Sequence, residues 1–401
     1  MSKQRLKVLS FTTVYPRPGD PRFGIFVRAR LQHLGELAEV RVVSPMAAVY
    51  YGMAGKRLMG LNGIEGPVRD GNVMVEYPRW VYPPGMGWAH GWWLRRFAQG
   101  TVERVRRGFP FDVIDAHFGH PEAWAACGLA RRFGAPFTVT LRGNETAHGK
   151  DEKKRRRMAE ALRAAARVIA VSGPLRAFAI ELGVRPDRAV VIPNGIDAGV
   201  FHPRDRAAER ARLGMGDGEL HILSAGYLIK RKGHHRIVET LTGLRARGLK
   251  VRLWIAGEKG AEGDYAGEIR RRVGECGVED AVRFVGAVAP AELACYMNAC
   301  DVFCLASNRE GWPNVVNEAL ACGAPVVATD VGGVPAMIVD GRFGRVVPVG
   351  DSAALEEALA RALTGVWDRG AISAQGMKRS WGEVAREVFE QLSAAAEENR
   401  Q

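Results

Sequence analysis

Short apolar runs alternate with longer amphipathic segments along the first half of the chain. Bounded apolar runs of this length are typical of buried strands, and apolar residues recurring every three to four positions indicate helices that bury one face. The predicted strands are Val8–Phe11, Val40–Val43, Val113–Ala116, Phe137–Leu141, Val168–Val171 and Val190–Ile192, and the predicted helices include Phe26–Leu37, Glu122–Phe133 and Lys153–Ala166.

The second half repeats this alternation. Its predicted strands are Ile222–Ala225, Leu253–Ala256, Val282–Val285, Val302–Leu305, Val326–Ala328 and Arg345–Val347. Helices are predicted to begin near Gly233, Tyr265, Pro290, Pro313 and Val334, and Ser352–Leu363 and Trp381–Ala394 are predicted as terminal helices.

Strands that alternate with helices predict an α/β protein with parallel, doubly wound sheets. A chain of 401 residues exceeds the size at which one core stops growing, so we expect two domains. We place a Rossmann-like domain over residues 1–197 and a second over 198–378, facing a central cleft. The final helix, residues 379–401, is expected to pack back toward the N-terminal domain.

Composition excludes several classes of protein. With 47% hydrophobic and 25% charged residues, the chain is neither disordered nor fibrous. It contains no apolar run long enough to span a bilayer, and its first ten residues do not resemble a signal peptide. None of its six cysteines forms a C-x-x-C pair, which favours reduced thiols and a cytoplasmic location.

The positive charge is concentrated in the N-terminal half. Residues 1–200 hold 31 Lys and Arg against 17 Asp and Glu, whereas residues 201–401 hold 26 against 27. A one-sided basic surface suits an anionic partner such as a phospholipid surface, a phosphorylated substrate or nucleic acid. A general solubility feature is the alternative.

The segment Glu310-Gly-Trp-Pro-Asn-Val-Val-Asn-Glu318 follows the predicted strand Val302–Leu305. Pro313 suits the first turn of a helix, and the free N–H groups of a helix start attract anions. Two carboxylates beside such a start suit a sugar nucleotide, because carboxylates accept hydrogen bonds from sugar hydroxyls. Two solvated surface glutamates are the alternative.

Further motifs occur with this one in a fixed order: Val190-Val-Ile-Pro-Asn-Gly-Ile-Asp197, Ala225-Gly-Tyr-Leu-Ile-Lys-Arg-Lys-Gly233, Ala319-Leu-Ala-Cys-Gly-Ala-Pro-Val-Val327 and Asp330-Val-Gly-Gly333. Together they resemble glycosyltransferase family 4, whose members have the GT-B fold. The resemblance runs over nearly the whole chain, from Tyr15–Gly24 to the final helix. It implies a retaining transferase that uses a nucleotide-sugar donor, UDP- or GDP-linked.

The resemblance also implies roles for residues of the C-terminal half. Glu318 would hold the nucleotide ribose, and Glu310 would contact the donor sugar as a catalytic residue. Lys232 would bind the donor diphosphate. Tyr227 stands where the family often has Arg, so Arg231 or Lys230 is the candidate for the missing charge. Gly311 and Asn314, beside the helix start, complete the predicted donor site.

In the N-terminal half, the resemblance places Gly24 over the donor phosphates, where a missing Cβ permits close approach. His117 ends a predicted strand, where α/β ligands bind, and is the candidate catalytic residue that contacts the donor sugar. His120 is the competing candidate, and a satisfied structural histidine is the alternative. Arg142, after the next strand, is a candidate contact for phosphate or acceptor.

Metal independence is expected. A departing nucleoside diphosphate gains negative charge, which either a metal ion or protein cations stabilise. No Asp-x-Asp pair occurs in the sequence, so we assign this task to lysine and arginine and expect no metal and no cofactor.

A membrane contact is suggested by seven aromatic residues between Tyr77 and Phe97, interleaved with arginines, and by the basic run Lys153–Arg157. Such a mixture suits a membrane interface. An ordinary aromatic cluster between helix and sheet is the alternative.

These observations predict a glycosyltransferase that acts on a lipid-linked or membrane-proximal glycan in polysaccharide or glycolipid synthesis. We expect it in the cytoplasm, peripheral on the inner face of the membrane. A sugar-nucleotide epimerase of the same fold is the first alternative. A nucleic-acid-binding protein is the second, although no zinc-ligand spacing or stacking platform supports it, so no nucleic-acid partner is expected.

Overall fold

The computed structural model describes residues 5–17, 19–52, 55–58, 66–260 and 263–400. The chain divides into two compact units. The first comprises Met1–Gly195 together with Trp381–Gln401, and the second comprises Ile196–Ser380. The chain therefore changes unit at Gly195/Ile196 and again at Ser380/Trp381.

The first unit contains an eight-stranded sheet in the order β12-β11-β10-β9-β1-β2-β7-β6. All neighbouring pairs are parallel except β6 and β7. The strands are β1 (Lys7–Phe11), β2 (Glu39–Val43), β6 (Val68–Asp70), β7 (Val73–Glu76), β9 (Val113–His117), β10 (Phe137–Leu141), β11 (Arg167–Ala170) and β12 (Ala189–Val191). Two short pairs lie beside it: β3 (Met46–Ala47) with β8 (Arg79–Trp80), and β4 (Val49–Gly52) with β5 (Gly55–Leu58).

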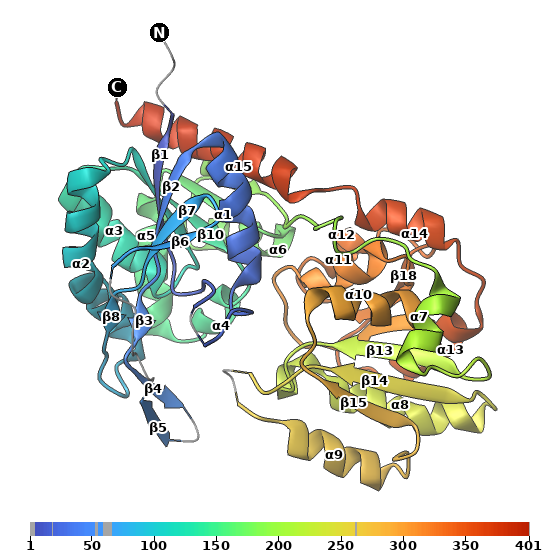
Figure 1. The fold of residues 1–401 in the computed structure, drawn as a ribbon. Helices are drawn as coiled ribbons and strands as arrows, with labels where there is room; N and C mark the ends of the chain where they lie inside the picture. The colour runs from blue at the N-terminus through green and yellow to red at the C-terminus, as the bar shows by residue number, and fades with distance from the viewer. Residues whose placement is uncertain (1–4, 18, 53–54, 59–65, 261–262, 401) are drawn as a thin grey trace. The chain divides into compact units, whose positions relative to one another are not determined.

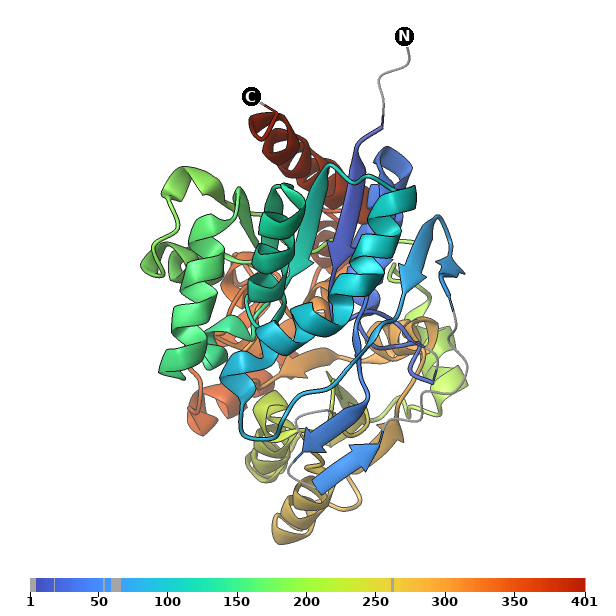
Figure 2. The same cartoon turned by 90° about the vertical axis from the view of Figure 1, so that its left-hand side faces the viewer.

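Helices cover both faces of this sheet (Figures 1 and 2). On one face α1 (Ile25–Leu37) packs against α15 (Trp381–Glu398), and on the other α2 (His90–Gly108), α3 (Glu122–Phe133) and α5 (Glu152–Ala164) lie in a row. The core between α15, α1 and the sheet includes Trp381, Leu392, Leu31 and Val113. The last helix thus completes the core of the unit that the first residues begin. The short helices α4 (Glu145–His148) and α6 (Gly173–Glu181) follow β10 and β11.

Helix α2 was not among the predicted elements. Its buried residues Leu94, Ala98, Val102 and Val105 have helical spacing. The dense aromatic and arginine residues of the same segment obscure this pattern in the sequence, because they occupy the exposed and half-buried positions, such as Trp92 and Phe97.

The second unit contains a six-stranded sheet, entirely parallel, in the order β15-β14-β13-β16-β17-β18. Along β16, Phe303 and Leu305 join one hydrophobic cluster, and Val302 and Cys304 join another on the opposite face. The strands are β13 (Leu220–Ala225), β14 (Val251–Ala256), β15 (Val282–Gly286), β16 (Val302–Leu305), β17 (Val326–Thr329) and β18 (Gly344–Val347). The helices are α7 (Arg206–Leu213), α8 (His234–Ala246), α9 (Ala266–Glu275), α10 (Pro290–Ala299), α11 (Asn314–Ala321), α12 (Val334–Met337), α13 (Ser352–Thr364) and α14 (Arg369–Gly376).

The predicted fold class, two parallel-sheet domains of α/β type, is confirmed. Successive residues of a strand point to opposite faces, so a strand buried on both faces needs a continuous apolar run, as the sequence has. Among the described residues, no helix is both long and apolar enough to cross a bilayer.

Candidate active site

Lys232 is positioned by the glycine that follows it. The 3₁₀ turn Lys230–Lys232 lies between β13 and α8, and Gly233 adopts a left-handed φ of 74°. A Cβ on Gly233 would lie 1.9 Å from the carbonyl oxygen of Ala306. Only glycine permits this approach, which brings the turn against the segment that leaves β16.

The Lys232 ammonium is bound to Glu310. Its Nζ lies 2.7 Å from Glu310 Oε1, which also accepts a 2.8 Å hydrogen bond from Ser307. Arg231 lies 3.5 Å from the other carboxylate oxygen. Burial acts to raise the pKa of Glu310, but the two cations and the hydrogen bonds outweigh it and lower that pKa. Glu310 is therefore a carboxylate held between cations at the carboxyl end of β16.

The glycines of the Asp330–Gly333 segment hold the loop that carries Glu310. Gly333 N donates to Gly311 O at 2.9 Å. A Cβ on Gly332 would lie 2.3 Å from Glu310 O, and one on Gly333 would lie 2.2 Å from the Trp312 ring. The close backbone contact fixes the loop that leads into α11, whose first residue is Asn314.

Glu318 lies on the second turn of α11 and is half-buried. Among the described residues its carboxylate has no hydrogen-bond or ion-pair partner. Burial raises the pKa of Glu318 to about 7, and the charge of Lys232 only partly opposes this shift. The helix therefore presents a carboxyl group with free hydrogen-bonding capacity beside Lys232. The six residues predicted for the donor site in this unit, Arg231, Lys232, Glu310, Gly311, Asn314 and Glu318, all lie in these neighbouring segments.

The other predicted site residues belong to the first unit. Gly24 caps the start of α1 with φ 70°, and a Cβ there would lie 2.7 Å from the backbone of Val14. His120 is buried, and its Nε2 lies 3.0 Å from Gly87 O, with the His148 ring 5.3 Å away. His120 thus contacts the segment that precedes α2.

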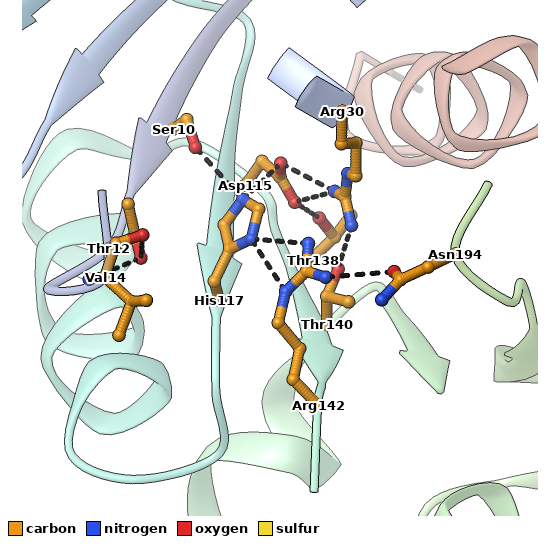
Figure 3. Close-up of polar contacts among 10 residues, drawn as sticks. All are labelled: Ser10, Thr12, Val14, Arg30, Asp115, His117, Thr138, Thr140, Arg142 and Asn194. Carbon is orange, nitrogen blue, oxygen red and sulfur yellow. Dashed lines mark hydrogen bonds and ion pairs between the residues drawn. The ribbon is translucent and has the colours of Figure 1, made fainter. Parts of the chain in front are cut away.

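His117 is the last residue of β9 and is fully buried (Figure 3). Its Nε2 lies 3.1 Å from Asp115 Oδ2 and 3.1 Å from Ser10 Oγ, while its Nδ1 accepts hydrogen bonds from Arg142. Burial lowers the pKa of His117 to about 3 despite the opposing charge of Asp115. The imidazole is neutral, and both ring nitrogens are occupied within the unit.

Arg142 follows β10 and is also buried (Figure 3). Its Nε and Nη2 lie 3.2 and 2.9 Å from His117 Nδ1, and Nη1 lies 3.3 Å from Asn194 Oδ1. The ring of Phe26 lies 5.2 Å from the guanidinium carbon. The loop that carries Arg142 is fixed by Glu145, which accepts hydrogen bonds from the backbone N–H of Gly119, Arg142 and Gly143.

Sequence reasoning missed Asp115, Arg30 and Ser307. Arg30 Nη2 lies 2.9 and 2.8 Å from the two oxygens of Asp115, and both side chains are buried. A signal was available, because Asp115 and His117 lie two residues apart in an apolar strand and so share a face. Arg30 also lies three residues after buried Val27, on the apolar face of α1.

Among the described residues, no group of three or more His, Cys, Asp or Glu side chains is arranged to hold a metal ion. Near Glu310 the charges that oppose the carboxylate are Lys232 and Arg231.

Comparison with known proteins gives the family. Residues 24–200 match the model described as Glycosyltransferase Family 4, and residues 205–379 match the model described as Glycosyl transferases group 1. A D-inositol 3-phosphate glycosyltransferase of Arthrobacter sp. (strain FB24) is 31% identical over 74% of this chain and 74% of its own. The chain belongs to glycosyltransferase family 4. The predicted family is confirmed.

Other relatives of this glycosyltransferase match over different lengths. The protein of the same name from Pseudarthrobacter chlorophenolicus is 31% identical over 61% of this chain, and the chain spans 61% of that relative. A putative teichuronic acid biosynthesis glycosyltransferase of Bacillus subtilis is 28% identical, with 83% of either chain covered. Anabaena HepE, solved with UDP and glucose, is 20% identical over 96% of this chain and 99% of its own, with a TM-score of 0.73. This likeness shows that the glycosyltransferase has the predicted GT-B fold.

The raised pKa of Glu318 predicts a pH-dependent stability. Between about pH 4.5, its ordinary pKa, and pH 7, the folded protein binds this proton more strongly than the unfolded chain does. The free energy of unfolding therefore falls as pH rises through this window. Glu318→Gln should leave stability unchanged at pH 4 and raise it by about 1–3 kcal/mol at pH 8, measured by urea unfolding. Glu279→Gln, at an exposed position of the same unit, should leave the free energy of unfolding unchanged at both pH 4 and pH 8. Equal stabilities of Glu318→Gln and wild type at pH 8 would contradict the assignment.

Proposed function

We propose that this glycosyltransferase moves a sugar from a nucleotide-sugar donor to a hydroxyl acceptor. The observation that carries the proposal is the Lys232–Glu310 ion pair at the carboxyl edge of the second unit's sheet, beside the unpaired carboxyl of Glu318. Ligands of open α/β sheets bind at this edge. A cation and carboxylates side by side suit a ligand that carries both phosphates and hydroxyl groups.

In this proposal Lys232 and Arg231 hold the donor diphosphate. Glu318 accepts hydrogen bonds from the ribose hydroxyls, for which its carboxylate has free capacity. The backbone around Gly311 and Asn314, at the start of α11, donates to a phosphate or sugar oxygen. Gly24, in the first unit, gives a phosphate close access to the backbone before α1.

The reaction proceeds with retention of configuration. The bond from the anomeric carbon to the phosphate oxygen breaks, and the acceptor oxygen forms a bond to the same face of that carbon. The acceptor proton passes to the departing diphosphate. Glu310, fixed by Lys232 and Ser307, accepts a hydrogen bond from a donor-sugar hydroxyl and faces the positive charge that develops on the sugar.

The proposed donor is a UDP-linked sugar, because HepE was solved with UDP and shares the fold. The proposed acceptor is a lipid-linked or membrane-proximal glycan of a cell-surface polymer, in keeping with the name of the Bacillus subtilis relative. The names of the other relatives support an acceptor that carries a phosphate.

A membrane contact through α2 completes the proposal. Trp92 and Phe97 are exposed on this helix, and Trp93 packs edge-on against Trp92 at 4.6 Å. Arg96 and Arg107 are exposed on the same helix. The basic run contributes less free charge than its sequence suggests, since Arg155 pairs with Glu181 at 2.7 Å and Arg157 lies 3.4 Å from Glu160.

Donor binding is tested by titrating UDP, GDP and ADP and their glucose conjugates, followed by thermal shift and calorimetry. One nucleotide should stabilise the protein, because a ligand of the folded state raises the melting temperature. Glu318→Ala should weaken its affinity about tenfold, and Glu310→Ala should lower kcat at least a hundredfold with a smaller change in affinity. Glu279→Ala is the control. Absence of nucleotide binding, or wild-type behaviour of both site variants, would refute the proposal.

Metal independence is tested with excess EDTA. Turnover should stay within twofold of the untreated enzyme, because Lys232 and Arg231 neutralise the leaving group. Lys232→Ala should lose at least a hundredfold in turnover in the same buffer. Loss of activity in EDTA that Mg²⁺ or Mn²⁺ restores would show instead that a metal ion does this work.

Membrane binding is tested by sedimentation with vesicles. The protein should sediment with vesicles that contain acidic lipid and less with neutral ones, because each basic residue near an anionic surface contributes on the order of 1 kcal/mol. Added salt should weaken the association. Joint replacement of Trp92 and Trp93 by Ser, or of Arg96 and Arg107 by Gln, should reduce sedimentation and leave nucleotide affinity unchanged. Val339→Ser, an exposed apolar change in the second unit, is the control. Vesicle binding that does not depend on lipid charge, or that neither pair of substitutions reduces, would contradict the membrane contact.

A further inference from the structure

A continuous set of buried polar contacts runs from α1 to the carboxyl ends of β9 and β10 (Figure 3). Arg30 on α1 contacts both oxygens of Asp115 and donates to Thr140 Oγ1 at 2.7 Å. Burial acts to raise the pKa of Asp115, but the charge of Arg30, the contact with His117 and the charge of Arg142 together outweigh it and hold that pKa far below its usual range. Asp115 is therefore an anion fixed in place beneath His117.

Asp115 determines which ring nitrogen of His117 carries the proton. A carboxylate only accepts, so the 3.1 Å contact assigns the proton to Nε2. Nδ1 is then an acceptor, as its two contacts with Arg142 require. To serve as a general acid or base, the ring would have to break its bonds with either Asp115 or Arg142.

Arg142 is a buried cation without a carboxylate partner. Among the described residues, no carboxylate lies within ion-pair distance of its guanidinium, and its polar contacts are neutral His117 and Asn194. These contacts use three of its five N–H donors. Asp115 and Glu145 attract this cation only from beyond ion-pair distance. A buried charge without a paired counter-ion is costly, and an anionic ligand in contact with it would lower that cost. The strand ends beside Arg142 are also where ligands of parallel sheets bind.

The geometry points to Arg142 as the binding group for a substrate phosphate, with His117, Asp115 and Arg30 as positioning residues that aim its guanidinium. This inference rests on the proposed function, since it assumes a substrate with a phosphate group. It gives His117 a different role from the catalytic one expected from the sequence. The phosphate belongs either to the donor diphosphate or to the acceptor.

Inorganic phosphate is the probe, titrated by calorimetry into Lys232→Ala protein so that the cation of the second unit does not contribute. Arg142→Gln in this background should weaken phosphate binding at least tenfold. Arg176→Gln, at a basic residue of the same unit whose guanidinium contacts backbone carbonyls away from this network, should leave it within twofold. Phosphate binding that Arg142→Gln leaves unchanged, or no binding in the Lys232→Ala background, would overturn the inference. Neither of these two outcomes depends on nucleotide binding, so failure of this inference can be distinguished from failure of the proposed function.

If His117 acts by positioning Arg142, its replacement by Asn and its replacement by Gln should have different effects on phosphate affinity. Asn places an oxygen near the position of Nδ1, whereas Gln reaches the position of Nε2. His117→Asn should keep phosphate affinity within threefold, and His117→Gln and His117→Ala should lose about tenfold. A larger loss of phosphate affinity in His117→Asn than in His117→Gln would overturn the positioning role of His117. Urea unfolding of each variant identifies any that is not folded, and only folded variants are compared.

Two further measurements complete the test. The imidazole ¹⁵N signals of His117, identified by their loss in His117→Asn, should show the Nε2–H form without titration from pH 5.5 to 8, since Asp115, Arg30 and Arg142 face the ring. Titration of His117 near pH 6.5 would overturn its positioning role.

The Arg142→Gln variant also shows which substrate carries the phosphate. If this variant weakens nucleotide affinity, the phosphate belongs to the donor. If nucleotide affinity is unchanged and KM for the acceptor rises, the phosphate belongs to the acceptor.

Discussion

The strands of a parallel sheet end at a common edge, and within each unit this constraint brings charged residues distant in the sequence into contact. In the second unit, the segments after β13 and β16 meet there, so Lys232 and Glu310, 78 residues apart, form one ion pair. In the first unit, the ends of β9 and β10 bring His117 and Arg142 into contact. Glycines make the approach possible where backbones touch, above all Gly233 against Ala306. Without parallel pairing, neither the two residues of the second unit nor the two of the first would be brought into contact.

The two units treat buried charge differently. In the second unit Lys232 is paired with Glu310, so the donor diphosphate of the proposed function would share that cation with a carboxylate of the protein. In the first unit the anion Asp115 forms an ion pair with Arg30, and the hydrogen-bond partners of the Arg142 guanidinium are neutral. Removing charged groups from water costs free energy in both units. For a buried cation without a paired carboxylate, such as Arg142, this cost is lowest when a bound ligand supplies the negative charge. Such sites are prepared for a ligand of defined charge before it arrives.

The sequence predicts the parallel sheets well because strands buried on both faces need continuous apolar runs, and Val302–Leu305 or Phe137–Leu141 are unmistakable. It predicts α2 poorly, because exposed aromatic residues mask the spacing of Leu94, Ala98 and Val102. The motifs locate Lys232, Glu310 and Glu318 in neighbouring segments. They do not reveal that Glu310 is already bound to Lys232, or that Arg30 and Asp115 lie beneath His117. Those pairings join residues 78 and 85 positions apart, and only the folded backbone determines them.

The return of α15 to the first unit has a consequence for synthesis of the chain. Ile196–Ser380 is one uninterrupted segment and can complete its core as soon as it has emerged. The first unit cannot, because Trp381, Leu392 and their neighbours, which cover Leu31 and Val113, are made only after the whole of the second unit. At about 5–20 residues per second, its apolar surface waits roughly 10–40 s for this cover. Of the two units, the one whose translation begins first is therefore the one that finishes folding last, and its apolar surface stays exposed to chaperones and proteases during that time.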